Sequence, residues 1–240
     1  MEIEGKRILV TGASRGLGRA LVAAFISAGA GRVFAGTRRE EDRQRLKTEL
    51  PQVVPVQLDV TNDADVERAP EWGTIDILVN NAGVACFGNP LTMDFAEVRK
   101  ELEVNYLGML RVTRAVVPAM IHQHDGMIVN VATAFAKVNL PLIGTYCATK
   151  SALLSLGQAL RAYLAEENVR VITVMPTTID TDMSRGADVP KMTTEFVAAE
   201  ILKAIREEKH DPPIGDEAHG VLEGLMKDPL GVEQMLMKYR

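Results

Sequence analysis

Residues 7–18 read RILVTGASRGLG and lead from a short apolar run into a turn that holds three glycines. The run Arg7–Thr11 is rich in β-branched residues, which is typical of a strand buried on both faces. The residues after Gly18 continue in a helical pattern. Glycines let a backbone approach a ligand closely, and a helix N-terminus offers free N–H groups to an anion. The segment therefore predicts a strand, a phosphate-binding turn and a helix.

The glycine spacing in this turn is G-x3-G-x-G, which differs from the G-x-G-x-x-G dinucleotide fingerprint. A tight turn without a ligand is the alternative interpretation. Three glycines within seven residues, however, cost backbone entropy unless a close approach uses them. We expect the turn to contact the pyrophosphate of a dinucleotide through Gly12, Ser14, Arg15, Gly16, Leu17 and Gly18.

Apolar runs alternate with helical patterns along the rest of the chain, and each gap is long enough for a crossover helix. Further strands are predicted at Arg32–Gly36, Val53–Leu58, Ile75–Asn80, Met127–Ala132 and Arg170–Met175. Helices are predicted at about Gly16–Ala28, Glu40–Glu49, Asp63–Arg68, Asp94–His122, Thr145–Glu166 and Thr194–Glu208. The alternation predicts an α/β fold, a single doubly wound parallel sheet with helices on both faces.

The chain has 240 residues, of which 47% are apolar and 25% charged, so a sizeable core is expected. No repeat or linker interrupts it, and residues 1–240 are predicted to form one Rossmann-type domain. The tail, residues 211–240, departs from the alternation. Pro212 and Pro213 stop a helix there, and apolar residues then return at helical spacing. We expect the tail to dock on the domain or on a neighbouring subunit.

Charge and composition exclude several classes of function. A net charge of −5 argues against binding nucleic acid by bulk charge, and no apolar stretch is long enough to span a membrane. Cys86 and Cys147 show neither metal-ligand nor disulfide spacing. With a strand predicted so close to the start of the sequence, they favour a cytoplasmic protein with reduced thiols, no signal peptide and no metal site.

The end of the second predicted strand bears on the choice of cofactor. It reads Gly36-Thr37-Arg38-Arg39, whereas an NAD site usually has an acid here for the ribose hydroxyls. An Arg can instead grip a 2′-phosphate through charge-assisted bonds, and Arg15 is a second cation within reach. We predict NADP(H), with Arg38 as the main contact. The alternative is that Arg38 and Arg39 are solvated surface charges.

Tyr146 and Lys150 stand four residues apart at the start of a long helical pattern, so their side chains share one helix face. A phenol has an ordinary pKa near ~10, and a nearby ammonium favours the phenolate. We therefore expect Lys150 to lower the pKa of Tyr146 into the range of a general acid or base.

Together these motifs resemble the short-chain dehydrogenase/reductase family over about residues 5–185. The resemblance rests on Thr11-Gly12-x3-Gly16-x-Gly18, Asp59, Asn80-Asn81-Ala82-Gly83, Asn105, Tyr146-x3-Lys150, and Pro176 with Thr181. It implies that Tyr146 is the catalytic acid or base, that Lys150 tunes it and holds the nicotinamide ribose, and that the Asn105 backbone positions a water in a proton relay. It also implies cofactor contacts from Asp59, Val60, Asn81, Ala82, Gly83, Pro176, Ile179 and Thr181.

The sequence departs from the family pattern at three places. Thr133 stands where the family usually has a Ser that polarises the substrate carbonyl. Its hydroxyl can donate the same hydrogen bond, although its methyl group narrows the site. Thr177 replaces a Gly after Pro176. The usual Asp-Gly-Gly near the C-terminus is absent, which leaves subunit contacts open between a dimer and a tetramer.

The residues and the resemblance predict an NADP(H)-dependent oxidoreductase that interconverts a small carbonyl compound and its alcohol. A non-catalytic dinucleotide-binding sensor or scaffold is the main alternative, and an epimerase or dehydratase a weaker one. Phe135, Leu140, Met183 and Met192 lie in segments that border the substrate in relatives, where packing and substrate contact are equally expected. Cys86 follows the Asn80–Gly83 segment and could face the cleft, but we interpret it as a small residue at the edge of the core.

Overall fold

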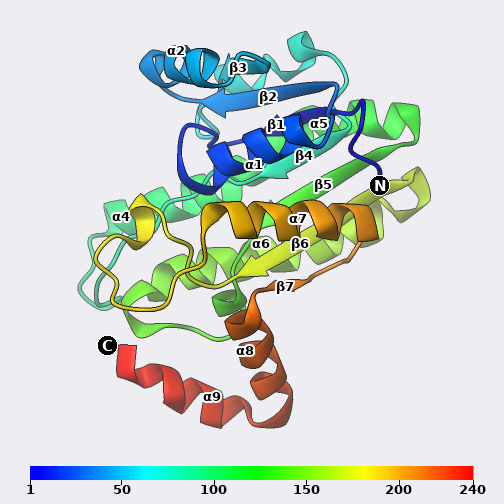
Figure 1. Cartoon of the computed structure of the whole chain (residues 1–240). Coiled ribbons are helices and arrows are strands. Elements are labelled where there is room, and N and C mark those ends of the chain that lie inside the picture. Colours follow the sequence, from blue (N-terminus) through cyan, green and yellow to red (C-terminus); the bar gives the residue numbers. More distant parts are fainter. Residues whose placement is uncertain (240) are drawn as a thin grey trace.

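One parallel sheet organises the computed structural model, which describes residues 1–239; Arg240, the end of the predicted tail, lies outside them. Within these residues seven strands occur in the order β3-β2-β1-β4-β5-β6-β7 (Figure 1). Their bounds are Arg7–Val10, Arg32–Thr37, Val53–Gln57, Ile77–Asn80, Gly126–Val131, Val169–Pro176 and Pro213–Ile214 for β1 to β7. All neighbouring strands pair in parallel, so the predicted sheet is confirmed.

Helices cover both faces of the sheet. Their bounds are α1 Gly16–Ser27, α2 Glu40–Glu49, α3 Asp63–Val66, α4 Phe95–Leu102, α5 Met109–Gln123, α6 Gly144–Tyr163, α7 Thr194–Glu207, α8 Asp216–Lys227 and α9 Pro229–Leu236. Leu21 of α1 and Ile201 of α7 pack with Ile8 and Val10 on one face, whereas Val116 of α5 packs with Leu9 on the other. Successive residues of β1 therefore enter opposite layers, as two-sided burial requires.

The structure differs from the sequence-based expectations in three elements. The helix expected over Asp94–His122 is divided into α4 and α5 by a π-helical turn at Glu103–Gly108. The short helix expected over Asp63–Arg68 ends at Val66. Strand β7 was not expected, because it has two residues, one of them Pro213, and exists only through its pairing with the end of β6.

The tail packs on the body of the same chain. After β7 it forms α8, α9 and a short 3-10 helix, Met237–Tyr239, which lie below the edge of the sheet in Figure 1. Val221 of α8 and Leu236 of α9 are buried against Phe135 and Cys147. None of the helices among residues 1–239 combines the length and apolarity that crossing a membrane requires.

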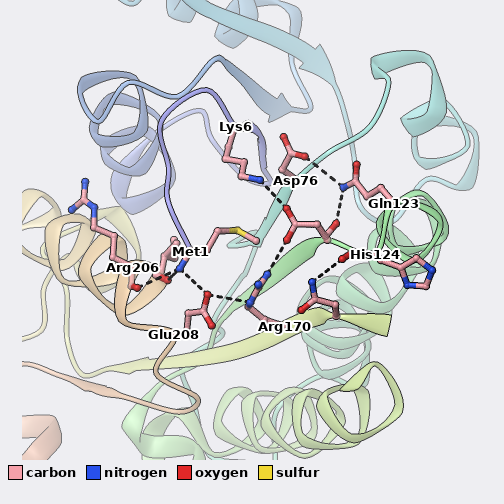
Figure 2. Close-up of polar contacts among 11 residues, drawn as sticks. Met1, Lys6, Asp76, Gln123, His124, Arg170, Arg206 and Glu208 are labelled. Carbon is pink, nitrogen blue, oxygen red and sulfur yellow. Dashed lines mark hydrogen bonds and ion pairs between the residues drawn. The ribbon is translucent and has the colours of Figure 1, made fainter. Parts of the chain in front are cut away.

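A polar network joins segments at the amino ends of the strands (Figure 2). The Asp125 carboxylate accepts hydrogen bonds from Lys6 Nζ at 2.8 Å and from Arg170 Nη1 at 2.9 Å. Arg170 also pairs with Glu208 at 3.1 Å, at the end of α7. Burial raises the pKa of Asp125, but the hydrogen bonds and charges of Lys6 and Arg170 outweigh burial and hold it below its usual value. The carboxylate is therefore stabilised in the folded chain.

Replacing Asp125 with Asn is expected to lower the free energy of unfolding by about 1 kcal/mol at neutral pH. Because the folded-state pKa is depressed, this contribution exists above the unfolded pKa of about 3.9 and is lost as the pH falls through the folded pKa. Urea denaturation across pH should show wild type and variant converging in acid. Glu233→Gln is the control, since Glu233 is exposed and has no ion pair among residues 1–239. A difference that stays constant down to acid pH would contradict this assignment.

Candidate active site

A cleft of about 1120 Å³ opens at the carboxyl ends of the strands, beside the reversal of strand order between β1 and β4. Ligands of open α/β sheets bind at such a switch point. The cleft is lined by nearly all the predicted site residues: Gly12, Ser14, Arg15, Gly16, Leu17, Gly18, Arg38, Asp59, Val60, Asn81, Ala82, Gly83, Thr133, Tyr146, Lys150, Pro176, Ile179 and Thr181. Asn105 does not line it and is fully buried behind its wall.

The glycine turn is packed tightly against the segment that follows β4. Gly12 has a φ of +64°, and a Cβ atom there would lie 2.8 Å from the Cα of Ala82. A Cβ atom on Gly18 would lie 2.3 Å from the carbonyl oxygen of Gly12. Both glycines are therefore required by packing within the chain, independently of any bound phosphate.

Side chains connect the ends of β1 and β4. The Thr11 hydroxyl oxygen accepts hydrogen bonds from the backbone N–H groups of Asn81 and Ala82, both at 3.0 Å. The Asn81 amide donates to the Thr11 carbonyl at 2.9 Å and to that of Gly12 at 3.2 Å. These bonds fix the glycine turn relative to the second half of the sheet.

Cations gather where the cleft passes the end of β2. Arg38 and Arg39 are exposed there, and no ion pair of either is found among residues 1–239. Arg15 instead pairs with Asp182 across the cleft at 3.2 Å. Arg45 of α2, which the sequence did not single out, donates to the carbonyl of Ser14 at 2.9 Å. Of the two cations predicted to meet a 2′-phosphate, Arg38 is the one without an ion-pair partner.

Tyr146 and Lys150 lie one helical turn apart on α6 and face the cleft together. Lys150 is 3% exposed, its Nζ donates to the carbonyl of Val131 at 2.8 Å, and it lies 5.7 Å from the centre of the Tyr146 ring. Burial lowers the pKa of Lys150 to about 8. Burial also raises the pKa of Tyr146, with smaller contributions from Cys147 and Glu101. The expected lowering of the Tyr146 pKa by Lys150 is therefore wrong, because desolvation of the phenol raises it.

Thr133 lies two residues after the end of β5 and lines the cleft together with this pair. It is 4% exposed, and its hydroxyl oxygen accepts a hydrogen bond from the Phe135 N–H at 3.3 Å. Because that bond uses a lone pair, the hydroxyl hydrogen can still be donated to another acceptor in the cleft.

Asn105 lies in the π-helical turn, and its side chain forms hydrogen bonds with the loop after β4. Its side-chain amide accepts from the Val84 N–H at 2.8 Å and donates to the Val84 carbonyl at 2.9 Å. It also donates to the Thr149 hydroxyl at 2.9 Å, which in turn donates to the Tyr146 carbonyl at 2.7 Å. The side chain thus connects the cleft wall to the helix that carries Tyr146. Its backbone role in a water relay stays a prediction.

The model of the family described as short chain dehydrogenase matches residues 6–190. The chain belongs to the short-chain dehydrogenase/reductase family. D-erythrulose reductase of Gallus gallus is 38% identical over 187 residues, which are 77% of this chain and 76% of the relative. L-xylulose reductase of Homo sapiens is 36% identical over 191 residues, 77% and 76% of the two chains. The resemblance drawn from the sequence motifs is confirmed.

Among solved structures, a short-chain dehydrogenase from Burkholderia cenocepacia J2315 in complex with NADP is similar over the whole fold. It has a TM-score of 0.93 and 38% sequence identity, and the similarity covers 99% of each chain. The similarity therefore extends through the tail, beyond the residues that the family model matches.

This dehydrogenase/reductase also buries an acid that the sequence gave no reason to single out. Glu101 is the one fully buried residue of α4, with 0% exposure, and accepts a hydrogen bond from the Cys86 N–H at 2.6 Å. Its other carboxylate oxygen has no partner among residues 1–239. Cys86 lines the cleft, so its interpretation as a core-edge residue is wrong. Its thiol donates to Glu97 at 2.7 Å, and its pKa is raised to about 11 by burial and by this bond.

Glu101 and Asn105 each accept a backbone hydrogen bond from the loop that forms this wall of the cleft. Four residues along a helix rise about 6 Å, and two residues along an extended segment span about 6.6 Å. The pair Glu101 and Asn105 on the helix therefore matches Cys86 and Val84 on the loop. The only sequence signal was this spacing of four.

Replacing Glu101 with Leu should remove the hydrogen bond that holds the Cys86 backbone in the cleft wall. Gln keeps an oxygen that can accept this bond from the Cys86 N–H. Both variants remove the same charge, so the comparison isolates the hydrogen bond. Losing a neutral hydrogen bond corresponds to about 1 kcal/mol, so iodoacetamide should alkylate Cys86 about fivefold faster in Glu101→Leu than in Glu101→Gln. Mass spectrometry reads the rates, with fully buried Cys147 as internal reference. Equal Cys86 rates in the two variants would show that Glu101 does not hold the wall.

Proposed function

We propose that this chain is an NADP(H)-dependent oxidoreductase that interconverts a carbonyl compound and the corresponding alcohol by hydride transfer. The observation that carries the proposal is the meeting of Thr133, Tyr146 and Lys150 in the same cleft as the glycine turn. The relatives named as erythrulose and xylulose reductases support carbonyl reduction, and the NADP complex of the Burkholderia relative supports the cofactor.

The residues present fit a nicotinamide dinucleotide phosphate. The turn before α1 points backbone N–H groups and a helix N-terminus into the cleft, which suits a pyrophosphate. Arg38, which has no ion pair among residues 1–239, supplies a cation at the end of β2, and no acid precedes it in that strand. Pro176, Ile179 and Thr181 line the cleft beyond the turn, and the methyl group of Thr181 would lie 3.2 Å from a Cβ atom on Gly16. Asn81, Ala82 and Gly83 with Asp59 and Val60 would line the adenosine side.

The bound cofactor would supply or accept the hydride. In reduction, Thr133 and Tyr146 would donate hydrogen bonds to the carbonyl oxygen, where negative charge develops. The raised pKa keeps Tyr146 protonated and therefore ready to act as the acid. Once the proton has left, the Lys150 ammonium, held by the Val131 carbonyl, would stabilise the phenolate. We assign the Asn105 backbone to the relay that returns a proton.

Tyr146→Phe should reduce kcat by about a thousandfold or more, because it removes the general acid, while the dissociation constant for NADPH changes little. NADPH oxidation over a panel of aldehydes, ketones and quinones measures turnover, and NADPH fluorescence measures binding. Tyr163→Phe is the control on the same helix, since Tyr163 is 80% exposed. Near-normal turnover in Tyr146→Phe would refute its role. NADPH binding without turnover in the wild type would instead favour the sensor or scaffold.

Arg38→Asp should weaken NADPH binding about tenfold to a hundredfold, because a carboxylate repels the 2′-phosphate. NADH lacks this phosphate, so the affinity for NADH relative to that for NADPH should rise. Arg39→Asp is the matched control, because Arg39 is the next residue and is exposed like Arg38. Dissociation constants for both cofactors follow from their fluorescence titrations. An unchanged ratio in Arg38→Asp would overturn the assignment of the 2′-phosphate site.

A further inference from the structure

The part of the cleft beside Tyr146 has apolar walls. Phe135 is buried there, and Leu140, Ile143, Tyr146 and Tyr239 pack against the same cluster. All of these side chains also line the cleft. They come from three parts of the chain, namely the segment after β5, the approach to α6 and the end of the tail. Beyond Thr133 and Lys150, the side chains packed with the catalytic phenol in this cluster are therefore apolar or aromatic.

Large apolar side chains also surround the mouth of this part of the cleft. Phe87 is 59% exposed, Leu142 43% and Met183 40%, and each lines the cleft. They come from the loops after β4, before α6 and after β6. The Gly88 N–H donates to the Leu142 carbonyl at 2.9 Å, which joins the first two loops. Exposed apolar side chains gathered around a concave site are typical of a surface that binds an apolar ligand.

Charged groups are few at this end. Lys100 lies within 3.3 Å of Glu97, and Asp182 pairs with Arg15 and Arg185. Glu217 is exposed at the start of α8. A polyhydroxylated substrate loses water from each hydroxyl on binding and needs a protein partner for each, or the unpaired groups reduce its affinity. Apart from Thr133 and Tyr146, which the carbonyl oxygen would use, the walls described above offer mainly hydrocarbon.

We propose that the substrate is a carbonyl compound with an apolar body, whose carbonyl group meets Thr133 and Tyr146 and whose hydrocarbon extends past Phe135 and Leu140 to the rim formed by Phe87, Leu142 and Met183. This inference rests on the proposed carbonyl chemistry. It distinguishes the chain from the relatives named for the ketoses erythrulose and xylulose. The tail takes part in the choice of substrate through Tyr239.

A series of straight-chain aldehydes from butanal to decanal, reduced with NADPH, tests the proposal, because chain length changes burial but leaves carbonyl reactivity the same. We expect kcat/KM to rise about fourfold for each methylene that the walls cover, the equivalent of about 0.8 kcal/mol. D-erythrulose and L-xylulose should be at least a hundredfold poorer than the best aldehyde. A flat series, or ketoses reduced better than the aldehydes, would overturn the proposal.

Leu142→Gln should flatten the chain-length dependence for the longest aldehydes, because it places an amide on the rim. Leu91→Gln is the matched control, since Leu91 is 90% exposed and does not line the cleft. An unchanged slope in Leu142→Gln would remove Leu142 from the substrate path and contradict the proposed route.

Binding of the corresponding straight-chain amides, which cannot be reduced, separates the two proposals. Their dissociation constants in the presence of NADPH, read from NADPH fluorescence, should fall about fourfold per methylene whether or not turnover occurs. Length-dependent amide affinity without reduction of any aldehyde would refute the proposed function and retain the apolar site. Length-independent affinity together with turnover would refute the apolar site alone.

Discussion

The hydrogen bonds between Thr11 and Asn81 join β1 to β4 at the point where the strand order reverses, and the cleft is arranged around that point. One hydroxyl oxygen accepts from two successive N–H groups, so the segment after β4 cannot shift without leaving the end of β1. The glycines of the turn permit this approach, because a Cβ atom on Gly12 would clash with Ala82. Continuing from Ala82, the wall reaches Asn105 and Glu101, and through Thr149 it reaches the helix that carries Tyr146. The end of the cleft at the glycine turn is thereby connected to the end at Tyr146 by short covalent and hydrogen-bonded paths.

Burial decides the proton chemistry at the reactive end. It opposes charge on both members of the pair, so the pKa of Tyr146 rises while the pKa of Lys150 falls to about 8. The phenol therefore stays protonated and can donate a proton, whereas Lys150, with a pKa of about 8, is still mostly a charged ammonium at neutral pH. A further positive charge in the cleft would reverse part of this effect, since an opposite charge favours the phenolate. The site is therefore suited to exchange its proton in response to the charge that a ligand brings.

The elements that local sequence controls were predictable, and those that depend on distant segments were not. Buried β-branched runs identified the six longer strands, and the spacing of Tyr146 and Lys150 placed them on one helix face. Strand β7 follows from pairing alone, and the raised pKa of Tyr146 follows from its burial among segments that are distant in the sequence. Glu101 resembles any solvated glutamate of a helix until the fold places Cys86 against it. Most of the site residues could thus be named, but their electrostatic environment could not.

The tail gives a physical reason why chemistry and specificity can vary separately in this fold. Thr133 follows β5, and Tyr146 and Lys150 lie on α6; β5 itself pairs with β4 and β6 and not with the tail. The apolar surroundings of Tyr146, in contrast, are completed by Val232, Leu236 and Tyr239. We therefore expect a change of sequence in the tail to alter the volume and hydration of the pocket but to leave the hydrogen bond from Lys150 to Val131 in place. Because Tyr239 both packs in this cluster and lines the cleft, we expect substitutions there to alter the docking of the tail together with the hydrocarbon body that the proposed pocket accepts.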